Sequence, residues 1–125
     1  MPDEITLTVP RERPFFRVAH LVLGGLAVRL DLTFDTLEDL QIALAGLLSR
    51  EHDGEGSLTM AVRVLPDALQ ASIGPFEDGA LREEWDSDQE LGLRRILETV
   101  VDGVEIAHRD GAQWVELTKN LARAA

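Results

Sequence analysis

The chain has 125 residues, of which 45% are apolar, and a formal net charge of −11. This length and composition are typical of one folded domain and argue against disorder. We therefore expect a single domain over residues 1–125. Its 12 lysines and arginines are outnumbered by 23 acidic residues, so a nucleic-acid partner is not expected, because such binding depends on basic side chains at the phosphates. The absence of cysteine excludes disulfides and thiolate metal sites.

No membrane segment is expected. The longest apolar stretch, residues 15–30, is interrupted by Arg17, His20 and Arg29, and it falls short of an uninterrupted spanning helix. The acidic start, Met1-Pro2-Asp3-Glu4, lacks the basic region of a secretory signal. The sequence therefore predicts a cytoplasmic protein.

The first third of the chain predicts a strand and then a helix. Residues 5–9 alternate apolar and polar side chains, as in a half-buried strand. Pro14 opens a helix that continues to residue 30, where Gly24 and Gly25 weaken the helix but let another backbone pack closely. The expected buried stripe consists of Phe15, Val18, Ala19, Val22, Leu26 and Leu30.

A second helix is predicted to start at Asp35, whose carboxylate can cap the backbone while Glu38 reaches back to it. It should end near Ser49-Arg50, before a polar loop over residues 51–56. Its expected buried face consists of Leu37, Leu40, Leu44, Leu47 and Leu48.

The rest of the chain predicts two hairpins separated by a helix. Residues 58–64 and 69–73 alternate on either side of a Pro66-Asp67 turn. After an acidic loop and a second capping box, Ser87-Asp88-Gln89-Glu90, a helix with an apolar stripe over residues 93–101 should end at a left-handed Gly103. Residues 104–108 and 115–119 then alternate around Asp110-Gly111, a strong turn signal.

This order favours an α/β (α+β) fold, a two-layer sandwich in which a mostly antiparallel sheet is covered on one face by about three helices.

Several phrases of the sequence resemble the anti-sigma-factor serine/threonine kinase family, within the GHKL (histidine-kinase-like) ATPase superfamily. The resemblance covers nearly the whole chain and implies the fold of that superfamily. The phrases are Pro14 to Leu30, Leu32-Thr33-Phe34-Asp35, Glu38-Asp39-Leu40, Leu91-Gly92-Leu93 through Val100-Val101-Asp102, Val104-Glu105-Ile106, and Val115-Glu116-Leu117-Thr118-Lys119.

The resemblance implies a glutamate general base on the second helix and, four residues later, an asparagine that holds magnesium. Gly46 and Arg50 stand at these two positions. Glycine cannot accept a proton, and arginine offers no acceptor atom to a magnesium ion. Neither a catalytic residue nor a metal site is therefore expected.

Two further motifs of the family contact the nucleotide. Ser72 stands where the resemblance implies an adenine-binding aspartate, with Gly74 after it, although Asp78-Gly79 is an alternative alignment. Gly92 remains from a glycine pair that opens the last helix, while Glu90 replaces the other glycine. Arg50, Ser72, Gly74 and Gly92 are thus the candidate cofactor-binding residues of a vestigial nucleotide cleft.

Two functions follow from the resemblance. In the first, the protein is an anti-sigma regulatory factor that needs no cofactor and binds a sigma factor or a STAS-type anti-anti-sigma protein, in addition to forming a homodimer. The first helix and strand are its candidate contact surface. In the second, it is an active serine/threonine kinase or a nucleotide-binding protein with an atypical site for ATP and magnesium.

The remaining residues with chemical potential carry weaker signals. His20, His52 and His108 lack metal-ligand spacing, which favours structural roles. Trp85 lies among acidic residues and is either an exposed interaction anchor or a lid, whereas Trp114 is interpreted as structural.

Overall fold

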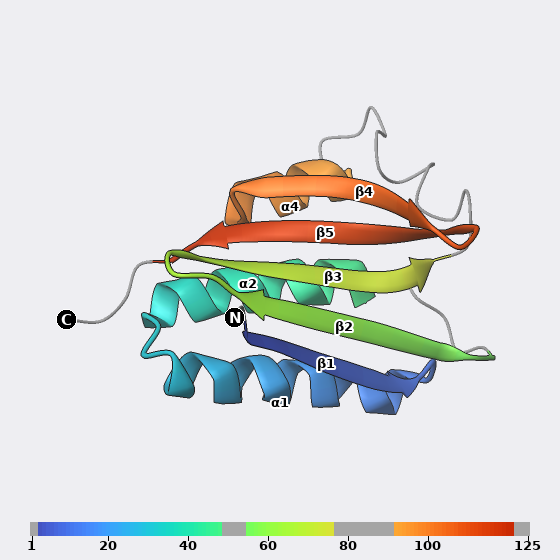
Figure 1. Cartoon of the computed structure of the whole chain (residues 1–125), viewed down its shortest axis with the longest axis horizontal. Helices are drawn as coiled ribbons and strands as arrows, with labels where there is room; N and C mark the ends of the chain where they lie inside the picture. The colour runs from blue at the N-terminus through green and yellow to red at the C-terminus, as the bar shows by residue number, and fades with distance from the viewer. Residues whose placement is uncertain (1–2, 49–54, 77–91, 122–125) are drawn as a thin grey trace.

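The computed structural model describes residues 3–48, 55–76 and 92–121. Within these ranges, five antiparallel strands form one sheet in the order β1-β2-β3-β5-β4, and three helices pack on one side of it (Figure 1). The predicted two-layer α+β fold is confirmed. The elements are β1 (Asp3–Pro10), α1 (Arg13–Arg29), α2 (Phe34–Leu48), β2 (Ser57–Val64), β3 (Ala68–Phe76), α4 (Leu93–Val100), β4 (Gly103–Arg109) and β5 (Ala112–Asn120).

The core lies between the sheet and the helices. Strand side chains alternate between the two faces of a sheet, so β2 and β3 send one set of apolar residues toward α2 and leave the other set on a helix-free face, called here the open face. Leu47, Leu93, Leu97 and Val115 are fully buried at 0% exposure. None of the described helices is long and apolar enough to cross a membrane.

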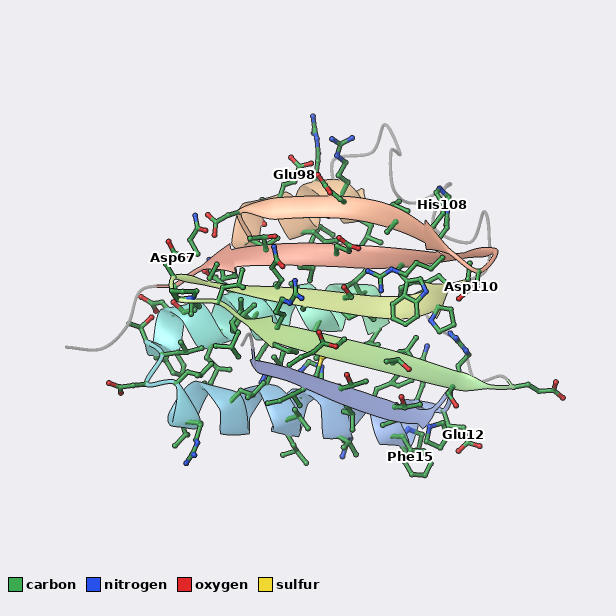
Figure 2. The ribbon with its side chains drawn as sticks, in the orientation of Figure 1. Glu12, Phe15, Asp67, Glu98, His108 and Asp110 are labelled. Atoms are coloured by element: carbon green, nitrogen blue, oxygen red, sulfur yellow. The ribbon has the colours of Figure 1, made fainter. Side chains whose placement is uncertain are left out.

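Helix α1 is rotated relative to the predicted stripe. Its buried residues are Phe16, Ala19, Leu23, Leu26 and Ala27, whereas Phe15 is 41% exposed and projects away from the sheet (Figure 2). The prediction that Phe15 is buried is wrong. Helix α1 is apolar on several sides, so periodicity alone did not fix which side packs inward.

Helix α2 starts slightly earlier than predicted and has a different cap. The Thr36 backbone N–H donates to Thr33 Oγ1 at 3.2 Å, which is the bond expected between the third helical residue and an N-cap. Thr33, rather than the predicted Asp35, therefore caps this helix. Helix α1 is tied to α2 by Gln41, whose Nε2 donates to the His20 carbonyl at 2.9 Å and whose Oε1 contacts His20 Nδ1.

The two hairpins agree with the sequence. The first turn is closed by the Leu65 N–H, which donates to the Ala68 carbonyl at 2.9 Å. In the second, Asp110 and Gly111 have φ values of 52° and 77°, as required at both central positions of a type I′ turn. Strand β3 extends three residues past its predicted end, to Phe76, with an irregular register after Ile73 and a cis Gly74–Pro75 peptide.

The end of α4 differs from the prediction. Val101 is the C-cap in an extended conformation (φ −127°, ψ 163°), and Gly103 already belongs to β4, paired with Thr118. The predicted left-handed Gly103 is therefore wrong. Because only Val101 and Asp102 separate the helix from the strand, no Gly-based turn is needed there.

Candidate functional site

The position at which the family resemblance implies a general base, Gly46, faces helix α4. A Cβ added to Gly46 would lie 3.9 Å from Ile96 Cγ2 and 4.0 Å from Leu93 Cδ1. Leu93 is fully buried, so this part of α2 lies at an apolar contact between two helices. Arg50, one turn further on, lies outside the described residues.

Gly46 offers no ligand to a magnesium ion. Magnesium prefers carboxylate and other oxygen ligands, and Gly46 supplies no side chain. Within residues 3–48, 55–76 and 92–121, no group of three or more His, Asp or Glu side chains could hold a metal.

Gly92 lies at the start of the last helix. It is the N-cap of α4 with φ −55° and ψ 143° and makes no side-chain capping bond, while its carbonyl accepts the Ile96 N–H at 3.1 Å. Its neighbour Leu93 contacts the Gly46 position, so Gly46 and Gly92 lie near each other on the helix side. Glu90, the predicted capping box and the alternative Asp78-Gly79 lie outside the described residues.

Ser72 lies on the open face of the sheet. Its neighbours in the strand, Ala71 and Ile73, belong to the buried core, so the side chain of Ser72 points the other way. It lines a hollow of about 300 Å³ together with Ala61, Arg63, Gln70, Arg109 and Glu116, among others. The sheet therefore separates Ser72 from Gly46 and Gly92.

Gly74 is explained by packing. A Cβ at this position would lie only 2.6 Å from Trp114 Cδ2 and 2.9 Å from Trp114 Cγ. Because side chains essentially never approach so closely, the Trp114 ring occupies the space that any larger residue would need. The structural interpretation of Trp114 agrees with this contact.

The candidate nucleotide residues therefore do not converge. Gly92 lies beside Gly46 on the helix side, and Ser72 points to the open face, as would a side chain on Gly74. The fourth candidate, Arg50, is not placed. Among the described residues, the structure does not bring Ser72 and Gly92 to one cleft.

Sequence reasoning missed two polar features of β5. On the open face, Arg109 donates to Glu116 Oε1 at 2.7 Å and places its guanidinium 5.2 Å from the Trp114 ring centroid. On the helix side, Gln113 is only 4% exposed, and its Oε1 has no hydrogen-bond partner among the residues that the structure describes. Only one feature of the sequence could have pointed to Gln113. It shares one face of the strand with Val115 and Leu117, and it is the polar residue of the three.

Comparison with known proteins finds relatives named serine-protein kinase RsbW. No family model matches the chain. It is 28% identical over 142 residues to the serine-protein kinase RsbW of Halalkalibacterium halodurans, covering 98% of this chain and 86% of the relative. The RsbW kinases of Listeria innocua and Bacillus subtilis are 28% and 26% identical over 92% and 95% of this chain, each with 86% of the relative covered.

A solved structure has the same fold. The crystal structure of the RsbU and RsbW domains of a Mycobacterium tuberculosis protein superimposes with a TM-score of 0.73 at 16% identity. The match covers 98% of this chain and 33% of that one, so this chain spans about a third of the solved protein. Together the comparisons confirm the resemblance to the anti-sigma-factor serine kinase family.

Proposed function

We propose that this protein is an anti-sigma regulatory factor that acts by binding a sigma factor or a STAS-type anti-anti-sigma protein. The similarity to RsbW kinases over nearly the whole chain supports a role in sigma-factor control. The observation that carries the choice of binding over catalysis is Gly46, which stands at the general-base position and lies against Leu93 and Ile96.

The chemistry supports this choice. A general base typically accelerates a reaction by about 10²–10⁴-fold, and a glycine in apolar contact with a neighbouring helix cannot supply it. Moreover, Ser72 lies on the opposite side of the sheet from Gly46. The sheet and its helices are retained, while Gly46 and Ser72 offer no general base. This combination is expected of a scaffold that is used for binding. We also propose that the protein forms a homodimer in the cytoplasm, as the resemblance implies.

The direct test is binding of the purified full chain to the sigma factors and STAS-type proteins encoded in its own genome, measured by titration calorimetry. A saturable complex with one of them is expected, with and without nucleotide. Absence of binding to all of them would overturn the proposal. Sedimentation velocity of the free chain tests the homodimer.

A serine/threonine kinase is the second candidate, and the names of the relatives favour it. Magnesium-dependent ATP binding in calorimetry, together with transfer of phosphate to a STAS-type protein, would support the kinase and contradict loss of the site. If nucleotide binds without magnesium, Arg50→Ala should weaken that binding, since Arg50 is one of the candidate cofactor-binding residues and its positive charge would attract a phosphate group. Unchanged affinity would exclude Arg50.

A further inference from the structure

Strand β4 forms an unpaired edge of the sheet. The two edge strands are β1 and β4. Helix α1 lies along β1 (Figure 1), whereas no strand in the described part of the chain pairs with the outer side of β4. Helix α4 packs behind the first part of β4, and the end of the strand, toward His108 and Asp110, extends past it (Figure 2). This end of β4 is therefore accessible to another strand.

The outer side of β4 presents a regular row of backbone groups. The turn at Asp110-Gly111 makes Arg109 and Ala112 a hydrogen-bonded pair. Because hydrogen-bonded and non-hydrogen-bonded pairs alternate along an antiparallel ladder, every second residue of β4 directs its N–H and C=O groups away from β5. These residues are Val104, Ile106 and His108. Proline or a bulge often protects such an edge, but residues 104–109 contain no proline and keep an unbroken register with β5.

The charges of this hairpin are not balanced within it. Glu105 lies directly opposite Glu116, and like charges in this arrangement destabilise a sheet. Arg109 binds Glu116 through Nη2 at 2.7 Å, while Glu105 forms no ion pair with any residue in the described ranges. A guanidinium carries several N–H donors, so Arg109 can also bind a second carboxylate.

We propose that two copies of the chain pair antiparallel through β4, centred on Ala107. The pairing is isologous, so Glu105 of each copy lies opposite the partner's Arg109. The outward backbone groups of Ile106 then bond those of the partner's His108, as in other cases of strand addition to a sheet edge. Centring the pair on Ile106 would leave Glu105 opposite alanine, and centring it on Glu105 would bring two carboxylates together.

The helices are compatible with this arrangement. A two-fold axis perpendicular to the sheet joins the two five-stranded sheets into one and keeps both helical layers on the same side. Since α4 lies behind the first part of β4 (Figure 1), a centre at Ala107 places the partner's α4 beyond the turn and away from α4. The proposal rests on the homodimer of the proposed function and names its interface.

The charge pairs are tested by sedimentation equilibrium of the full chain. Glu105→Arg places like charges opposite each other across the interface and should raise the dissociation constant of the dimer at least about tenfold. Within one hairpin the same change places an arginine opposite Glu116, which is favourable, so circular dichroism should show a folded chain. The double variant Glu105→Arg/Arg109→Glu restores opposite charges and should return the dissociation constant to within about threefold of the wild type. Arg63→Glu, a charge reversal on the open face, is the control that should dimerise like the wild type.

A disulfide tests the register. The chain has no cysteine, so Ala107→Cys introduces a single thiol. In the proposed register the two substituted positions form a non-hydrogen-bonded pair with Cα atoms about 4.5 Å apart, which a disulfide can span. Under mild oxidation this variant should form a covalent dimer at least about tenfold faster than Gln70→Cys, an exposed control position on β3.

The outcomes separate this interface from the proposed function. A wild-type dimer that is unchanged by Glu105→Arg, with no faster cross-linking of Ala107→Cys than of the control, would overturn pairing through β4 and leave the homodimer standing. A wild-type chain that stays monomeric at its highest soluble concentration would overturn the homodimer and this interface together. Binding to a sigma factor or STAS-type protein is measured separately and does not depend on either result.

Discussion

At the scale of single residues, Gly46 and Gly74 both stand at positions that the family resemblance assigns to the nucleotide site. The structure gives the two glycines different surroundings. Gly74 has no room for a side chain, because the Trp114 ring lies against it on the open face. Gly46 has room, because the nearest atoms would be 3.9 and 4.0 Å from an added Cβ. The sequence alone cannot distinguish these cases, since both are glycines within regular elements.

These environments predict opposite effects of the same substitution. Gly74→Ala should lower the free energy of unfolding by about 1–3 kcal/mol, because Trp114 must move. Gly46→Ala, the matched control, should raise it by up to about 1 kcal/mol through helix propensity. Urea denaturation followed by tryptophan fluorescence measures both. Equal effects of the two substitutions would contradict the packing account of Gly74.

At the scale of elements, the start of α2 shows how a sequence signal can point to the wrong cap. Asp35 and Glu38 match a capping box, yet the observed bond runs from the Thr36 N–H to Thr33 Oγ1. Both threonine and aspartate are good caps. The preceding loop, with Asp31 at φ 57°, decides which of them lies at the helix boundary.

The cap assignment can be tested by comparing two substitutions. Thr33→Ala should cost about 1 kcal/mol of stability, because it removes the capping oxygen. Asp35→Ala should cost less, about 0.3–1 kcal/mol of stability, since its carboxylate acts only through the helix dipole. Thermal and urea denaturation check the order of the two effects, and the reverse order would restore Asp35 as the cap.

Lys119 joins three elements. Its Nζ donates to Asp39 Oδ2 of α2 and to the Val100 carbonyl at the end of α4, both at 2.9 Å. Since Lys119 is only 16% exposed, this contact is better shielded than an ordinary surface ion pair. It holds two helices against the end of β5.

Replacing Lys119 with methionine keeps the apolar stem and removes both bonds. We expect a loss of about 1–2 kcal/mol in the free energy of unfolding, because Val100 loses a charged donor and Asp39 its partner. Glu98→Gln, which alters the exposed Arg94–Glu98 pair, should change stability by no more than about 0.5 kcal/mol. Lys119→Met with an effect as small as that of Glu98→Gln would show that the two bonds contribute little.

At the scale of the whole molecule, charge is the dominant feature that the sequence sets directly. The net charge of −11 opposes compaction through self-repulsion, while α1 carries three arginines and no acid. The excess of negative charge therefore lies outside α1.

Self-repulsion predicts a salt effect on stability. The melting temperature should rise when monovalent salt increases from about 10 mM to about 150 mM, because the Debye length then falls to about 8 Å. Differential scanning calorimetry in sodium chloride and in choline chloride measures this rise and separates screening from specific ion binding. A melting temperature that stays level or falls would show that repulsion does not limit the fold.

The sequence by itself determined the order of the elements, the antiparallel hairpins and the family resemblance. These depend on local signals, such as the alternation in β2 and the Asp110-Gly111 turn, which act between residues close together in the chain. The exposed side of α1, the opposite placement of Ser72 and Gly92, and the contact of Trp114 with Gly74 were decided only by the tertiary structure. Each depends on which face packs against a distant segment, and an apolar helix or a single strand residue does not encode that choice locally.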